Sequence, residues 1–332
     1  MELFELTKAL VNIESVTGHE HACAEFLRDY LGGRGFQVEL QPVSRERANL
    51  LALRGTPEIV LSTHLDTVPP WFPASEDEEF IFGRGACDAK GILASQVVAA
   101  ERLVSEGVGN FGLLFLVGEE LTSDGAREAN LHPCGTRYII NGEPTENKLA
   151  TGSKGILSVL VRARGRMAHS AYPHLGESAI EKLLDVLADL RRLPLPEDPV
   201  LGPATMNIGM ISGGRAVNVI PDEAHAHILI RTVNGSSELR ERISRLLEGR
   251  CEYQFVRETP ALRIEKLNGF ESAVVAFTTD LPSLTNWGRP LMIGPGSIHW
   301  AHTERERVAK RDLLQAVDLY CRLVKELKAK GF

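Results

Sequence analysis

An apolar run that ends in a His-x-Asp triplet constrains this chain more than any other feature. The segment from Glu58 to Ser62 predicts a buried strand, and His64 and Asp66 follow where that strand ends. Farther along, Asp88 stands among glycines at the start of a predicted helix. Imidazole and carboxylate groups in this setting are typical metal ligands. We infer a metal site that begins with His64 and Asp88 and that residues downstream complete.

Strands and helices alternate through the first part of the sequence. The apolar runs at 112–117 and 138–140 predict strands buried on both faces, and 88–106 predicts a helix. This alternation predicts an α/β fold with a mostly parallel sheet sandwiched by helices. Sites in such sheets lie beyond the carboxyl ends of the strands. Four side chains follow apolar runs and should meet at that edge: His64, Glu119, Glu120 and Glu143.

The pattern changes near Lys154 and returns after Leu262. Between them the order is strand, helix, strand, strand, helix, strand, which is typical of a small α+β domain of the ferredoxin-like kind. We therefore predict a discontinuous catalytic domain, residues 1–153 and 263–332. Residues 154–262 would form an inserted lid or dimerisation domain.

Composition and sequence motifs argue against several classes of function. The net charge of −7 over 332 residues does not favour nucleic-acid binding, which requires a basic face. Five scattered cysteines without CxxC spacing indicate reduced thiols rather than a disulfide framework. No secretory leader or apolar span of membrane length is evident. We expect a cytoplasmic protein without a membrane or nucleic-acid partner.

Five groups expected at strand ends have residue types that suit a centre with two metal ions: His64, Asp88, Glu120, Glu143 and His302. Two such ions require a carboxylate that bridges them, and Asp88 is placed centrally enough to do so. Glu119 precedes the candidate ligand Glu120, so its carboxylate would lie beside the metal and accept a proton from water. Each of these residues alone is more often solvated or structural. Their joint occurrence at strand ends favours the site.

Five segments in chain order resemble the di-zinc exopeptidase and deacylase family. That family includes acetylornithine deacetylase, succinyl-diaminopimelate desuccinylase, aminoacylase and glutamate carboxypeptidase. The matching segments span nearly the whole chain: Thr63 to Pro69, Gly83 to Gly91, Gly118-Glu119-Glu120, Asn141 to Thr145, and Ala301-His302 with Glu306 four residues on.

The resemblance implies two divalent ions, zinc with cobalt as an alternative, and a role for each candidate. The implied ligands are His64 and Glu143 for one ion, Glu120 and His302 for the other, and Asp88 for both. Glu119 would act as general base and then as general acid. Asp66 would orient the His64 ring. The resemblance also implies a cis peptide bond between Asp88 and Ala89.

The inserted segment and the region before His302 match the family as well. His169 would reach across a homodimer to stabilise the oxyanion. Asn218 and Arg231 would hold the carboxylate of the substrate. Gly294 and Gly296, in a segment closer to acetylornithine deacetylase than to its relatives, would let backbone amides approach that carboxylate.

The resulting expectation is a zinc-dependent amidohydrolase that deacylates N-acyl amino acids. The expected substrate is N-acetylornithine, as in arginine biosynthesis, or N-acetyl-citrulline, N-acetyl-lysine or N-succinyl-diaminopimelate. A metal-bridging water would attack the amide with Glu119 as general base. One alternative is a dipeptidase or carboxypeptidase of the same family. An alternative of another class is a non-catalytic metal-binding interaction module, against which the retention of Glu119 counts.

Overall fold

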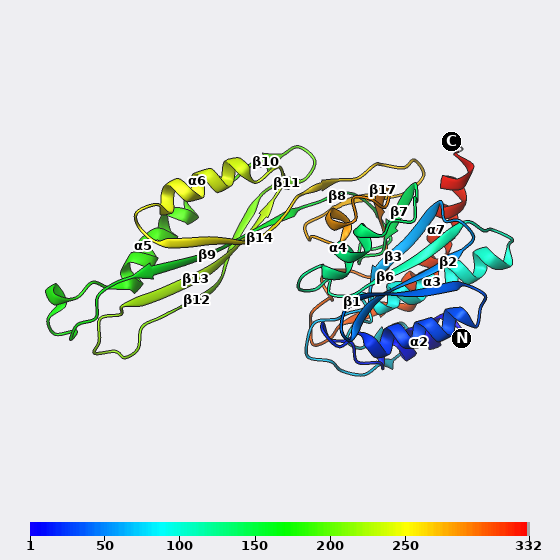
Figure 1. Ribbon diagram of the computed structural model, residues 1–332, viewed down its shortest axis with the longest axis horizontal. Helices are drawn as coiled ribbons and strands as arrows, with labels where there is room; N and C mark the ends of the chain where they lie inside the picture. Colours follow the sequence, from blue (N-terminus) through cyan, green and yellow to red (C-terminus); the bar gives the residue numbers. More distant parts are fainter. Residues whose placement is uncertain (331–332) are drawn as a thin grey trace. The chain divides into compact units, whose positions relative to one another are not determined.

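The apolar runs of the sequence form the centre of a six-stranded sheet. The computed structural model describes residues 1–330 and orders this sheet β1-β2-β6-β3-β7-β17 (Figure 1). The strands are β1 (Gln37–Ser44), β2 (Arg47–Arg54), β3 (Ile59–His64), β6 (Phe111–Leu116), β7 (Tyr138–Asn141) and β17 (Arg289–Met292). Every residue of β3, β6 and β7 is buried, so both faces of the sheet are covered there.

The direction of the strands determines where the site can form. Strands β6, β3, β7 and β17 run parallel, whereas β1 and β2 form an antiparallel pair beside β6. His64 pairs with Leu116 and Ser62 pairs with Asn141, so β3, β6 and β7 end at the same edge. The predicted α/β fold with a mostly parallel sheet is confirmed.

Helices whose apolar residues recur at helical spacing belong to the same part of the chain as this sheet. They are α1 (Leu3–Val11), α2 (His21–Gly32), α3 (Lys90–Ser105), α4 (Asp124–Leu131) and α7 (Lys310–Ala329). Helix α3 packs on β3 and β6 and against α7, while α2 packs on β1 and β2. Helix α3 begins at Lys90 rather than at the predicted Asp88, because the backbone of Ala89, with φ −137° and ψ 23°, lies outside the helical region. Within residues 1–330, no helix combines the length and the apolar character needed to cross a membrane.

The chain divides into two compact units. Unit 1 comprises Met1–Thr151, Ile264–Ala273 and the chain from Thr279 onward, and unit 2 comprises Gly152–Arg263 and Val274–Thr278. The remaining short elements are β4 (Ser75–Glu76), β5 (Phe80–Phe82), β8 (Leu149–Ser153), η1 (Pro173–Leu175), β10 (Glu197–Asp198), β11 (Gly202–Pro203), β15 (Leu262–Arg263), β16 (Ser272–Val275), η2 (Leu281–Ser283) and β18 (Arg307–Ala309).

Unit 2 is built on an antiparallel sheet ordered β12-β13-β9-β14. Its elements are β9 (Gly155–Arg164), α5 (Ala179–Arg191), β12 (Thr205–Gly213), β13 (Glu223–Thr232), α6 (Ser237–Leu247) and β14 (Glu252–Thr259). Helices α5 and α6 lie on one face of the sheet (Figure 1). Burial alternates along the whole of β13, as expected for a sheet with one covered face.

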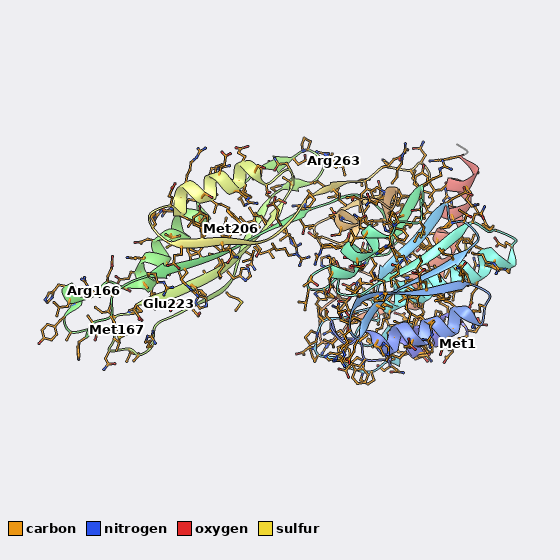
Figure 2. The ribbon with its side chains drawn as sticks, in the orientation of Figure 1. Met1, Arg166, Met167, Met206, Glu223 and Arg263 are labelled. Atoms are coloured by element: carbon orange, nitrogen blue, oxygen red, sulfur yellow. The ribbon has the colours of Figure 1, made fainter. Side chains whose placement is uncertain are left out.

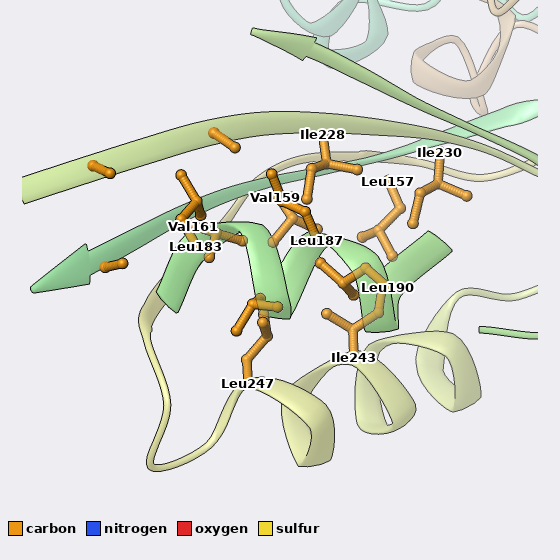
Figure 3. Close-up of a cluster of buried hydrophobic side chains, with 14 of the residues drawn as sticks. Leu157, Val159, Val161, Leu183, Leu187, Leu190, Ile228, Ile230, Ile243 and Leu247 are labelled. Atoms are coloured by element: carbon orange, nitrogen blue, oxygen red, sulfur yellow. The ribbon is translucent and has the colours of Figure 1, made fainter. Parts of the chain in front are cut away.

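The core of unit 2 lies between α5 and the covered face of the sheet. Leu183 and Leu187 of α5 face Val159 and Val161 of β9, and Ile243 of α6 closes the cluster from the other side (Figure 3). These side chains are at most 5% exposed. Their burial ties the two helices to the strands.

Truncating one core leucine of α5 tests this packing. We expect Leu183→Ala to lower the free energy of unfolding by roughly 2–5 kcal/mol, because it leaves a cavity in the core. Leu184, the next residue along α5, is 52% exposed, so Leu184→Ala should change it by less than about 0.5 kcal/mol. Urea denaturation of the full chain measures both. Equal losses for the two variants would contradict the assigned core.

Candidate active site

Three neighbouring strand ends bring most of the candidate residues to one edge of unit 1. His64 is the last residue of β3. Glu119 and Glu120 follow β6 after a short turn, and Glu143 follows β7 by two residues. At Gly118 in that turn the backbone has a φ of +78°, and an added Cβ would lie 2.0 Å from Asp124 Oδ1. A glycine is therefore required where the chain turns into the two glutamates.

The five predicted ligands form two clusters of potential metal ligands. His64, Asp88 and Glu143 form one, and Asp88, Glu120 and His302 form the other, with the ligand atoms of each within 4.8 Å of one another. Asp88 belongs to both. Its Oδ1 lies 3.0 Å from His64 Nε2, and its Oδ2 lies 3.5 Å from His302 Nε2.

Two of the ligand residues come from loops rather than strand ends. Asp88 precedes α3, and the predicted cis peptide bond between Asp88 and Ala89 is present. His302 lies in the loop before β18, with a positive φ of 62°, and its Nε2 is 3.0 Å from Glu120 Oε1. The sequence-based expectation that all five ligands follow strand ends is therefore wrong for Asp88 and His302.

Asp66 makes hydrogen bonds beyond the predicted contact with the His64 ring. His64 Nδ1 lies 2.9 Å from the backbone oxygen of Asp66 but 3.5 Å from its carboxylate. The carboxylate accepts hydrogen bonds from Thr17 Oγ1 at 2.7 Å and from the amides of Glu119 and Glu120 at 3.1 and 3.2 Å. The backbone oxygen of Asp66 is thus the nearer partner of the His64 ring. The carboxylate of Asp66 stabilises the turn that carries Glu119 and Glu120.

This arrangement predicts that Asp66→Asn lowers kcat/KM by about 10–100-fold, the usual effect of losing a partner that supports metal-site residues. The asparagine amide cannot accept from both backbone N–H groups as the carboxylate does. Asp77 also accepts two backbone N–H groups, from Glu79 and Phe80, in an exposed loop. Steady-state kinetics should show the loss for Asp66→Asn but not for Asp77→Asn. Equal kinetics for both variants would refute the role of Asp66.

A buried chain of hydrogen bonds orients Glu143, and sequence reasoning missed it. Gln96 Nε2 donates to the Ser62 carbonyl at 2.9 Å, and Ser62 Oγ donates to Asn141 Oδ1 at 3.0 Å. Asn141 Nδ2 then donates to Glu143 Oε1 at 2.9 Å. The Asn-Gly-Glu-Pro segment contained the signal, because an asparagine two residues before a ligand can support it.

The electrostatics of the clusters fit bound cations. Burial, followed by the negative charge of Glu143, raises the pKa of Glu119 well above its usual range. Burial also raises the pKa of Glu143, and the charge of Asp88 adds to the effect. Carboxylates this close repel one another, and divalent cations among them remove that penalty. The donor set of two imidazoles and three carboxylates suits zinc and its neighbours.

Unit 2 brings two other candidates together. His169 and Val219 form a β-bridge, and the Ser170 amide donates to the carbonyl of Asn218 at 3.0 Å. His169 is exposed, and its Nδ1 accepts from the Ala171 amide at 3.1 Å. Because Nδ1 accepts this hydrogen bond, the N–H of a neutral His169 ring is on Nε2 and can donate a hydrogen bond.

Arg231 lies at the other end of the same sheet from Asn218, with which it was predicted to hold the substrate carboxylate. Asn218 comes just before Glu223, the first residue of β13, and Arg231 is eight residues farther along. At about 3.3 Å per residue, Glu223 and Arg231 are roughly 26 Å apart along the strand. Arg166, Met167 and Glu223 lie at one end of unit 2 (Figure 2). Within one chain, Asn218 and Arg231 cannot hold the same carboxylate.

Gly294 has a different contact from the predicted one. Its amide donates to Thr145 Oγ1 at 3.0 Å, and an added Cβ would lie 2.5 Å from the carbonyl oxygen of Glu143. Gly294 thus packs beside a ligand residue, and its N–H is used within the protein. Gly296 has a φ of +81°, and an added Cβ there would lie 2.6 Å from Cys87 Sγ. Its contact with the substrate remains a prediction.

Comparison with known proteins shows to which protein family this chain belongs. The model of the peptidase dimerisation domain of the M20 family matches residues 151–256. A peptidase M20 domain-containing protein of Schizosaccharomyces pombe is 38% identical, over 97% of this chain and 84% of the relative. A probable carboxypeptidase of Aspergillus clavatus is 37% identical, over 97% of this chain and 82% of the relative.

Solved structures share the fold. A tripeptidase of Staphylococcus aureus aligns with a TM-score of 0.81 and 21% identity over 96% of both chains. An M20 family metallo-carboxypeptidase of Sulfolobus solfataricus aligns with a TM-score of 0.79 and 16% identity, over 97% of this chain and 98% of that one. The narrower likeness to acetylornithine deacetylase stays a prediction. The chain belongs to the M20 family of peptidases, and it is a metal-dependent hydrolase that acts on amide bonds.

Proposed function

We propose that this chain hydrolyses the amide bond next to a free carboxylate and releases the C-terminal amino acid of short peptides. The observation that carries the proposal is the pair of ligand clusters that share Asp88, together with Glu119, whose charge interacts with those of Glu143, His64 and Glu120. Curated relatives named as probable carboxypeptidases support a peptide substrate over an acetylated one.

The proposed ligands divide between two ions as the clusters do. His64 and Glu143 would hold one ion, Glu120 and His302 the other, and Asp88 both. Zinc fits this donor set, and cobalt is the alternative. When bound, two such ions supply Lewis acidity that polarises the scissile carbonyl and acidifies water.

Glu119 is the proposed general base and general acid. It belongs to neither cluster, although its neighbour Glu120 belongs to one. Its amide donates to Asp66, which fixes the backbone from which the carboxylate extends, and the charge of the carboxylate interacts with those of Glu143 and His64. In this position Glu119 would take a proton from the attacking water and return it to the leaving amine.

A homodimer formed through unit 2 would explain the separation of Asn218 from Arg231. The match to a dimerisation domain covers most of unit 2. His169 and Asn218 share one end of the sheet, while Arg231 is at the other end, where it donates to Thr278. We propose that His169 and Asn218 serve the substrate bound by a second copy. His169 Nε2–H would then donate to the developing oxyanion.

Deacylation of an N-acyl amino acid is the second candidate, because it breaks the same kind of bond. The segment from Gly294 to Ile298 favours it on sequence, with N-acetylornithine as its substrate. The strand-end residues do not distinguish an acetyl group from a peptide, since both present an amide carbonyl and a carboxylate.

A substrate panel with added zinc tests the proposal. N-blocked dipeptides, free dipeptides, N-acetylornithine and N-succinyl-diaminopimelate would each be assayed with the wild type and with Glu119→Gln. The proposal expects the highest kcat/KM on N-blocked or free peptides, abolished in the variant. Highest kcat/KM on N-acetylornithine would favour the second candidate. No hydrolysis of any member by the zinc-loaded protein would contradict both candidates and favour a binding module.

A further inference from the structure

Glu306 is a fully buried carboxylate outside both ligand clusters, and four donors surround it. Its Oε1 accepts from the backbone amides of Gly85 at 3.0 Å, Cys87 at 3.1 Å and Asp88 at 3.0 Å. Its Oε2 accepts from Arg84 Nη1 at 2.6 Å. Both oxygens are therefore occupied by donors from one loop, and hydrogen bonds to a charged acceptor are among the strong ones.

The same residue fastens that loop to the one that carries His302. Glu306 stands four residues after His302, and its carbonyl oxygen accepts from the Gly83 amide at 3.1 Å. Directly after it, Arg307 pairs with Phe82 as β18 joins β5. The loop before α3 and the loop before β18 are thus joined through the backbone and the side chain of Glu306.

We propose that Glu306 is a positioning residue for the metal centre, which sets Asp88 in place relative to His302. The inference rests on the proposed function, because it takes Asp88 and His302 as ligands. Asp88 has to serve both clusters, so a small shift of its backbone displaces a ligand from two ions at once. A carboxylate that fixes the Asp88 amide directly is suited to prevent that shift.

A purely structural role for the Arg84–Glu306 ion pair makes a different prediction. A buried pair of that kind affects stability wherever it lies in a protein. Arg84 also donates through Nε to the Pro70 carbonyl at 3.1 Å, so it has a partner besides Glu306. Three of the four donors to Glu306 are backbone amides, one of them of Asp88 itself. The positioning role therefore predicts a loss of metal affinity beyond any loss of stability.

Cobalt(II) binding to the metal-free full-length chain tests the inference without any substrate. Glu306→Gln keeps the side-chain length and one acceptor oxygen, but it removes the charge and sets an NH₂ group against Arg84 Nη1. We expect cobalt affinity to fall by about 10–100-fold and the visible absorption spectrum of the bound cobalt to change. Thermal unfolding of the metal-free variant, measured in parallel, reports stability alone.

Asp198 of unit 2 provides the matched control. Its Oδ1 accepts from the amides of Val200 at 2.8 Å and Leu201 at 2.9 Å, and its Oδ2 accepts from Arg263. Asp198→Asn should therefore lower the unfolding temperature and leave cobalt affinity and spectrum as in the wild type. If Glu306→Gln does not fold, the double variant Arg84→Met/Glu306→Gln removes the opposed donors and is expected to show the same loss of affinity.

The outcomes separate this inference from the proposed function. Wild-type binding of two cobalt ions with weaker binding by Glu306→Gln supports both. Wild-type binding with unchanged affinity and spectrum in the folded Glu306 variant overturns the positioning role and leaves the proposed metal centre intact. Absence of cobalt binding by the wild type overturns the metal centre and the inference with it.

Discussion

Replacing Glu119 by glutamine is expected to lower kcat on the best substrate by about 10²–10⁴-fold, the usual contribution of a general acid–base residue. The zinc content should stay at the wild-type value, because Glu119 belongs to neither ligand cluster. The backbone amide of residue 119 still donates its hydrogen bond to the Asp66 carboxylate in the variant, so the turn keeps its geometry. Kinetics with metal analysis of the same samples measures both quantities.

The adjacent Glu120→Gln variant is the control for this result. Glu120 is in the cluster with His302, and its Oε1 lies 3.0 Å from His302 Nε2. We expect this variant to lose zinc together with activity. If Glu119→Gln also loses zinc, or keeps wild-type kcat, Glu119 is not the proton carrier.

Replacing Asp88 by alanine should have the largest effect on metal content, because Asp88 is the residue that both clusters share. Its loss leaves His64 and Glu143 on one side and Glu120 and His302 on the other, with no carboxylate between them. We expect both ions to bind more than about 100-fold more weakly, above the range for residues that only support ligands. Zinc stoichiometry after dialysis against a defined zinc concentration measures the effect.

Glu143→Ala distinguishes a shared ligand from an ordinary one. Glu143 belongs to a single cluster, so its removal should cost one ion and leave the second bound. Loss of a single ion from Asp88→Ala would contradict the bridging assignment. Thermal unfolding of both metal-free variants would exclude a general loss of structure as the cause.

The sequence predicted the strand-end positions of His64, Glu120 and Glu143 because the hydrophobic pattern that marks a strand is a local signal. Apolar runs before His64, Glu120 and Glu143 placed those residues at one edge once the strands were known to be parallel. Asp88 and His302 were chosen from the sequence as strand-end ligands by their residue types, but both lie in loops, whose paths the hydrophobic pattern does not specify.

The errors and omissions concern contacts between residues far apart in the sequence. The carboxylate of Asp66 accepts from amides more than fifty residues away, so a rule based on its neighbour His64 named only one of its partners. Glu306 acts on amides more than two hundred residues away, and no pattern around Glu306 indicates them. The motifs that named Asn218 and Arg231 did not indicate that the length of β13 separates them within one chain.

Zinc titration of the chelator-stripped protein, followed by hydrolysis of an N-blocked dipeptide, tests the two-ion centre most directly. The donor clusters predict no turnover without metal, and recovery that reaches its maximum at two zinc ions per chain. Full turnover by the stripped protein would contradict the account. A maximum at one ion per chain that persists in a Glu120→Ala/His302→Ala variant would also contradict it.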